Sequence, residues 1–120
     1  MVPGMFSLLA VAAATLNLTF LDTGKTFTLP KQTTIVVTLI SCAPCGYHWQ
    51  LKPLNTSVLR RVSHRYVGHK SPPGVVGAGG KEIWRFVTVG AGRSPLQLAY
   101  YPPGRGTKPV RRFIVRINVS

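Results

Sequence analysis

The end of the chain alternates between two kinds of side chain with a period of two. In residues 112–119, apolar positions alternate with mostly polar ones: Phe113, Val115, Ile117 and Val119 against Arg112, Ile114, Arg116 and Asn118. Successive side chains of a β-strand point to opposite faces of a sheet, so the pattern predicts a strand with one face in a core. Residues 83–88 repeat it, with Trp84, Phe86 and Thr88 on one face. No segment of useful length has helical periodicity, which predicts an all-β fold class.

Turn residues divide the rest of the chain into further short segments of strand composition. The 12 Gly and 10 Pro punctuate apolar and β-branched runs at residues 16–20, 26–29, 33–40, 47–51, 59–67 and 96–100. The run TTIVVTLI at 33–40 has the composition of a strand buried on both faces. Residues 68–80, with five Gly and two adjacent Pro, form the longest loop. About seven strands with frequent turns predict one domain, an immunoglobulin-like β-sandwich.

The charge balance is strongly basic. Fifteen Lys and Arg stand against two acids, Asp22 and Glu82, which gives a net charge of +13. Such an excess favours encounters with acidic partners. Nucleic acid, an anionic membrane surface and an acidic protein all satisfy this condition, so charge alone selects none of them. Because a hydrolase needs a nucleophile, a base and an orienting acid, a chain with two isolated acids is not expected to be an enzyme.

The first twenty residues contain no charged side chain. The apolar run from Met5 to Leu16 has the length of a signal-peptide core and is too short for a membrane span. Small residues at Ala12, Ala13 and Ala14 offer a cleavage site, although the usual Lys or Arg before the run is missing. We therefore expect a signal peptide over residues 1–14, a domain over 15–120 and a secreted or otherwise extracytoplasmic protein. A buried first strand or helix is the alternative.

The sequence CAPC at residues 42–45 has the spacing of a dithiol redox site. Such sites activate the first thiol at a helix N-terminus, whereas Gly46 and Tyr47 lead into a strand here. A redox enzyme is therefore not expected. In an exported protein, a local disulfide between Cys42 and Cys45 is the favoured state, and free thiols are the alternative.

The same cysteines can be combined with histidines into a metal-ligand set. Zinc binds tetrahedral sets of Cys and His, and Cys42, Cys45, His48 and either His64 or His69 are the available residues. The second ligand pair lacks a recognisable spacing, so neither a metal nor another cofactor is expected.

Aromatic residues near basic ones raise the alternative of nucleic-acid binding. The aromatic and apolar residues in question are Trp84, Phe86, Leu98, Tyr100 and Phe113. They share the inward parity of their strands, so core packing is expected, whereas Arg85, Arg112 and Arg116 have the opposite parity. No specific nucleic-acid partner is expected. A basic β-sandwich module that binds nucleic acid or acidic surfaces without specificity is the alternative function.

Three segments between the expected strands carry a family pattern. In the first, Ser41–Trp49, the residues Gly46, Tyr47 and Trp49 match N-P-T-T-G-F/Y-x-W, with Cys42, Ala43, Pro44 and Cys45 in place of N-P-T-T. The second is a full match to G-x-G-G at Gly77, Ala78, Gly79 and Gly80. The third stands where the pattern has x-R-P-W, at Tyr101, Pro102, Pro103 and Gly104, of which Pro103 matches. Over residues 16–120 the chain thereby resembles the chagasin family of inhibitors of papain-like cysteine peptidases.

The resemblance implies a function and a mechanism. The three loops would cluster at one end of the sandwich, as variable loops do in immunoglobulin domains, and enter the active-site cleft of a papain-like cysteine peptidase. Inhibition would be reversible, by occlusion, from a monomer. The first loop, with Pro44 and Cys45 at the threonine positions, would lie closest to the catalytic cysteine of the peptidase. The loop from Gly77 to Gly80 would lie along a substrate-binding groove.

Overall fold

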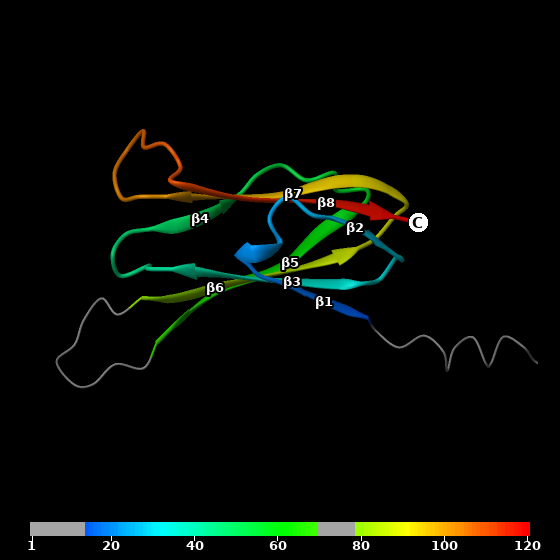
Figure 1. Ribbon diagram of the computed structural model, residues 1–120, viewed down its shortest axis with the longest axis horizontal. Coiled ribbons are helices and arrows are strands. Elements are labelled where there is room, and N and C mark those ends of the chain that lie inside the picture. The colour runs from blue at the N-terminus through cyan, green and yellow to red at the C-terminus, as the bar shows by residue number, and fades with distance from the viewer. Residues whose placement is uncertain (1–13, 70–78) are drawn as a thin grey trace, which may run out of the picture.

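The computed structural model describes residues 14–69 and 79–120. Their strands form two four-stranded sheets that face each other (Figure 1). The expected all-β, immunoglobulin-like sandwich is confirmed, with eight strands in place of about seven. Residues 1–13 lie outside the described residues, so the signal peptide stays a prediction.

The first sheet has the order β1-β3-β6-β5. Its strands are β1 (Thr15–Leu18), β3 (Thr34–Ser41), β6 (Gly80–Thr88) and β5 (Leu59–Gly68). β1 pairs with β3 in parallel and the other pairs are antiparallel. β5 is a ten-residue edge strand with a bulge between Arg61 and Ser63.

The second sheet has the order β2-β8-β7-β4. Its strands are β2 (Thr26–Leu29), β8 (Arg111–Val119), β7 (Gly92–Tyr101) and β4 (His48–Leu51). β2 pairs with β8 in parallel, and β7 lies between β8 and the short edge strand β4. A single 3₁₀ turn, η1 (Phe20–Asp22), follows β1.

The core lies between the two sheets and consists of the inward-facing residues that the period of two predicts. Trp84 and Phe86 on β6 and Phe113, Val115 and Ile117 on β8 are buried. Burial of each such side chain stabilises the fold by about 1.5–3 kcal/mol relative to exposure. The predicted parity of these strands is therefore confirmed.

Two details of the sequence interpretation are wrong. β3 is not buried on both faces, because its outer face lies on the uncovered side of the first sheet: Leu39 is 1% exposed and Ile40 is 80% exposed. The first strand ends at Leu18, since Thr19 caps η1 and accepts a hydrogen bond from the Leu21 backbone N–H, which places Phe20 in the turn.

Candidate functional site

The strand registers bring the three predicted loops to one end of the sandwich. Ser41 at the end of β3 pairs with Gly80 at the start of β6, and His48 at the start of β4 pairs with Tyr101 at the end of β7. The first loop (42–47), the second loop (69–79) and the third loop (102–110) therefore begin and end at the same edge (Figure 1). Of the second loop, Gly77 and Ala78 lie outside the described residues.

The first loop contacts both of the others. Gly46 has a φ of +87° and abuts the third loop so closely that a Cβ there would lie 2.9 Å from Pro103 Cβ. On the other side, the position of a Cβ at Gly79 lies 3.9 Å from Cys42 Cβ and 3.6 Å from the Ser41 carbonyl oxygen. Glycine at these two positions lets the first loop approach the third loop and the described end of the second loop closely.

The first loop is closed on itself. Cys42 and Cys45 form a disulfide, with their Cα atoms 5.2 Å apart. The Cys42 carbonyl accepts hydrogen bonds from the Cys45 N–H at 3.2 Å and the Tyr47 N–H at 3.1 Å. Ala43, Pro44 and Cys45 form the exposed tip. The disulfide uses both thiols of the candidate metal-ligand set, and the next element after it is the strand β4, which begins at His48.

An aromatic stack supports the base of the first loop. The Tyr100 hydroxyl accepts a hydrogen bond from the Cys42 N–H at 3.0 Å, and the Tyr100 ring stacks on Tyr47 at 5.3 Å and on Trp49 at 4.7 Å between centroids. The indole Nε1 of Trp49 donates to the Ile40 carbonyl at 3.0 Å. Tyr47 is thus half-buried and serves mainly to fix the loop, while the tip residues stay exposed.

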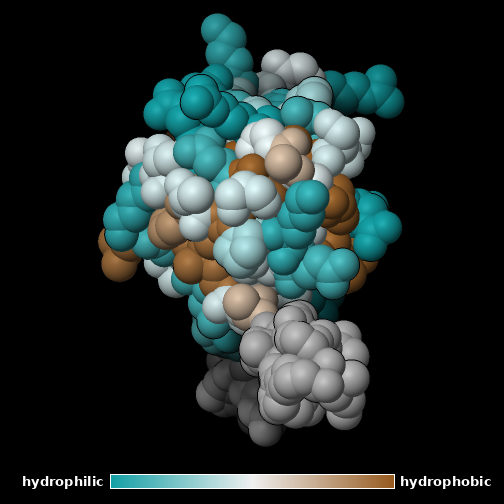
Figure 2. Space-filling model, turned by 90° about the vertical axis from the view of Figure 1, so that its right-hand side faces the viewer, coloured by the Kyte–Doolittle hydropathy of each residue, from teal (hydrophilic) through white to brown (hydrophobic). Residues whose placement is uncertain are grey.

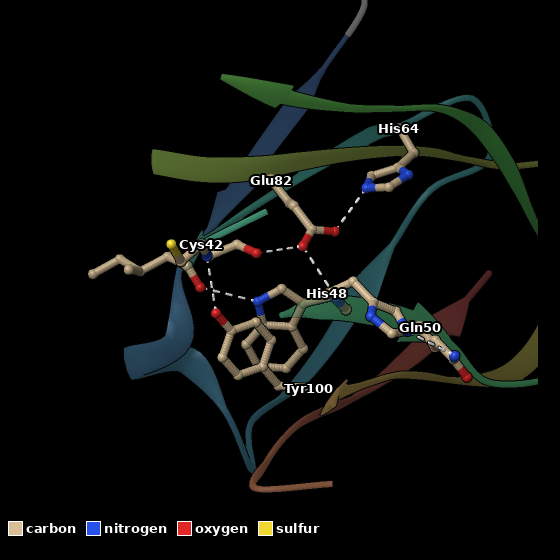
Figure 3. A network of polar contacts seen from close by, with 9 residues as sticks. Cys42, His48, Gln50, His64, Glu82 and Tyr100 are labelled. Atoms are coloured by element: carbon tan, nitrogen blue, oxygen red, sulfur yellow. Dashed lines mark hydrogen bonds and ion pairs between the residues drawn. The ribbon is translucent and has the colours of Figure 1, made fainter. Parts of the chain in front are cut away.

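A buried carboxylate joins the strands beneath the loops (Figure 3). Glu82 on β6 is 3% exposed. Its Oε2 accepts hydrogen bonds from the Ser41 hydroxyl at 2.6 Å and from the Trp49 N–H at 3.0 Å. Its Oε1 lies 2.7 Å from Nε2 of His64, whose ring stacks on Trp84 at 3.7 Å. Because β4 belongs to the second sheet, Glu82 ties the two sheets together where the first loop begins and ends.

Sequence reasoning missed the role of Glu82. Its position two residues before Trp84 gave it the inward parity of β6, which is the signal that could have revealed it. A buried acid needs hydrogen-bond donors around it, and an inward-facing acid beside an aromatic core position therefore indicates a polar network.

The four predicted residues of the third loop differ from one another in exposure and in contacts. Tyr101 is the last residue of β7; its ring stacks on His48 at 5.9 Å and its hydroxyl accepts a hydrogen bond from Lys52 Nζ at 2.5 Å. Pro103 and Gly104 are exposed, whereas Pro102 is half-buried and its carbonyl accepts from the Thr107 hydroxyl at 3.3 Å. Tyr101 therefore braces the loop from the side of the sheet.

The electrostatic character of this end is basic. Arg105 and Lys108 are exposed on the third loop, and the two acids of the chain lie outside all three loops. The opposite end of the molecule, which faces the viewer in Figure 2, exposes apolar areas among hydrophilic residues, as is usual for a protein surface. Within residues 14–69 and 79–120, helices long and apolar enough to cross a membrane are absent.

The chain matches a family model described as chagasin family peptidase inhibitor I42 over residues 28–119. No curated protein matches it in sequence.

Solved structures share its fold. The cysteine protease inhibitor EhICP2 from Entamoeba histolytica has a TM-score of 0.79 at 19% identity, over 92% of this chain and 100% of that chain. Amebosin has a TM-score of 0.69 at 23% identity, over 91% of this chain and 100% of that chain. PbICP-C, solved in complex with falcipain-2, has a TM-score of 0.50 at 18% identity, over 92% of this chain and 94% of that chain.

Proposed function

The chain belongs to the chagasin family of peptidase inhibitors, and we propose that it inhibits papain-like cysteine peptidases by placing its three loops in the active-site cleft. It is an inhibitor and not an enzyme. The observation that carries the proposed mode of action is the contact of the first loop with both others, through Gly46 and Pro103 on one side and Cys42 and Gly79 on the other.

Pre-organisation is the physical basis of the proposed inhibition. Loops that are already ordered lose little conformational entropy when they enter a concave site, so more of the contact energy becomes affinity. In the first loop, the disulfide, the stack on Tyr100 and the hydrogen bonds from Ser41 and Trp49 to Glu82 supply this order. The exposed tip from Ala43 to Cys45 then reaches deepest, nearest to the catalytic cysteine of the peptidase.

The target class follows from the solved relatives and the charge. EhICP2 is a cysteine protease inhibitor, and PbICP-C was solved with falcipain-2. A net charge of +13 raises the encounter rate with a peptidase of acidic surface and opposes self-association, so the inhibitor acts as a monomer in this proposal. The uncharged apolar segment at the start of the sequence and the disulfide both support action outside the cytoplasm.

A titration tests the proposed inhibition. The chain from Thr15 onward is added to a cathepsin-L-like peptidase and to papain, and hydrolysis of a fluorogenic peptide is followed. We expect competitive inhibition with a Ki below about 1 μM, which corresponds to about 8 kcal/mol of binding free energy. Full peptidase activity at tens of micromolar inhibitor contradicts the proposal.

The bracing role of the disulfide has its own test. Reductant also maintains the catalytic cysteine of the peptidase, so the double variant Cys42→Ser/Cys45→Ser is cleaner than reduction. We expect its Ki to rise about tenfold, equivalent to about 1.4 kcal/mol, because the tip must be ordered on binding. An unchanged Ki shows that the hydrogen bonds of the loop are sufficient without the disulfide.

A further inference from the structure

An apolar groove lies beside the three loops and is lined mainly by residues outside them. It has a volume of about 540 Å³ and runs between η1, the outer side of β3 and the starts of β6 and β8. Its main lining residues are Phe20, Leu21, Ile40, His69, Lys81 and Arg111.

The apolar wall of this groove includes two large side chains that the fold leaves in water. Leu21 is 89% exposed and Ile40 is 80% exposed. Neither contributes to the core, so packing within the folded monomer does not explain why these positions carry large apolar side chains. Exposed apolar residues gathered in one groove with a polar rim are typical of an interaction site.

The rim of the groove is cationic. Lys81 and Arg111 border it, and the Arg111 guanidinium lies 5.5 Å from the centre of the Phe20 ring. Both acids of the chain are engaged elsewhere, Asp22 with Lys25 and Glu82 with His64. The rim therefore offers two cations to a carboxylate from outside, and the apolar wall can contact an apolar side chain next to it.

The groove is continuous with the loop surface. Ile40 directly precedes Ser41 and the first loop, His69 is the first residue of the second loop and Gly80 directly follows it, and Arg111 directly follows the third loop. A partner that receives the loops is therefore also brought next to the groove. A second copy of the chain is disfavoured as the occupant, because each copy carries a net charge of +13.

We propose that this groove is a second contact site for the same peptidase, and that it binds a surface segment next to the cleft in which an apolar side chain adjoins a carboxylate. This inference rests on the proposed function. It makes the groove, with Leu21, Ile40, Lys81 and Arg111, a determinant of which papain-like peptidases are bound tightly.

The test separates the groove from the loops by using two forms of an acidic papain-like peptidase. One form is active, and in the other a covalent peptidyl inhibitor fills the cleft. The variants are Leu21→Ser/Ile40→Ser for the apolar wall and Lys81→Glu/Arg111→Gln for the rim. The matched control is Val62→Ser/Arg93→Glu, which makes the same kinds of change at exposed residues outside the groove.

We expect both groove variants to raise the Ki for the active peptidase about tenfold while the control stays within about twofold. The rim variant is also expected to weaken the dependence of the association rate on salt. The intact inhibitor is expected to retain weak binding to the blocked peptidase, and both groove variants to abolish it.

The outcomes distinguish the two proposals. If the intact chain inhibits and the groove variants behave like the control, the groove is not a contact site and the proposed function stands. If the intact chain binds the blocked peptidase through the groove but does not inhibit the active one, the groove stands and inhibition fails. Binding to neither form overturns both.

Discussion

At the scale of single residues, glycine is required for two different reasons, a positive φ and close packing against a neighbour. Gly46 and Gly24 both have a positive φ, +87° and +90°. A Cβ at Gly46 meets Pro103 at 2.9 Å, whereas nothing lies within 4 Å of a Cβ at Gly24. The two positions therefore carry the same backbone demand but differ in close packing, and only Gly46 lies in the loops.

Gly46→Ala is predicted to weaken inhibition. The backbone strain costs about 1–3 kcal/mol at either position, but only at Gly46 does the new methyl group push the first loop away from Pro103. We expect the Ki to rise at least tenfold, measured by titration of a papain-like peptidase. Gly24→Ala is the control, with a similar loss in urea unfolding and an unchanged Ki. Equal effects of the two variants on the Ki would falsify the role of the Gly46 contact.

Asp22 is predicted to give the fold a small acid-sensitive contribution. The Thr19 backbone N–H and then the Lys25 ammonium hold the pKa of its carboxyl below the ordinary value. A lowered pKa in the folded state means that the contribution is complete above the unfolded value of about 3.9 and is lost as the pH falls through the folded value.

Asp22→Asn tests the predicted direction of this pH dependence of stability. We expect wild type to exceed the variant by about 0.5–1 kcal/mol in unfolding free energy at pH 7, because the capping carboxylate is partly exposed. The difference should shrink toward zero near pH 2. Urea unfolding of both proteins at several pH values measures it, and a difference that grows in acid contradicts the assignment.

At the scale of elements, β4 is a four-residue edge strand that Glu82 secures from the opposite sheet. β4 pairs with its neighbour β7, and the Glu82 carboxylate accepts a hydrogen bond from the Trp49 N–H. Since β4 carries the exit of the first loop, the position of that loop depends on a residue on β6 that is not in any loop.

Glu82→Leu is predicted to lower both stability and inhibition. A leucine side chain has no hydrogen-bond acceptor, so the Ser41 hydroxyl and the Trp49 N–H both lose theirs in the core. We expect a loss of about 2–4 kcal/mol in denaturant unfolding and a several-fold higher Ki. His64→Gln is the control variant, which removes only the histidine partner of Glu82. It leaves the contacts to Ser41 and Trp49 intact and should cost less and leave the Ki unchanged.

The elements also show what the sequence could and could not predict. Alternation located β8 and β6 correctly, because the opposite sheet covers one face of each strand. In the run at 33–40, the β-branched composition indicates burial on both faces, whereas Ile40 is exposed because no described residue covers the outer face of the first sheet there. The loop motifs predicted which loops meet. The contact of Gly46 with Pro103 depends on the register of β4 with β7, which local sequence does not encode.

At the scale of the whole molecule, the charge is strongly unbalanced, with fifteen Lys and Arg against two acids. Arg112 and Arg116 are exposed on the outer face of the second sheet, as their parity predicted, and they lie on β8 away from the loop tips. Charge acts at long range, so these residues are expected to influence how fast an acidic partner arrives more than how tightly the loops bind.

The double reversal Arg112→Glu/Arg116→Glu is predicted to leave inhibition nearly intact. It lowers the net charge by four, from +13 to +9. We expect a Ki within about threefold of wild type, with slower association at low salt, because rim charges act mainly on the association rate. Binding to DNA, measured by fluorescence anisotropy against salt, tests the alternative of a basic binding module. A wild-type chain that binds DNA without inhibiting the peptidase, together with a variant that loses this binding, favours that alternative.

The edge strand β5 has a consequence for behaviour in concentrated solution. A ten-residue edge strand offers unpaired backbone groups on which another copy can add a strand, and this is a common route to aggregation. Here the bulge after Arg61 interrupts the regular spacing, and Arg60, Arg61 and Arg65 are exposed along the strand. Two such edges repel each other before they can pair. β5 is therefore expected to keep the protein dispersed when it accumulates, and high salt is expected to reduce that protection.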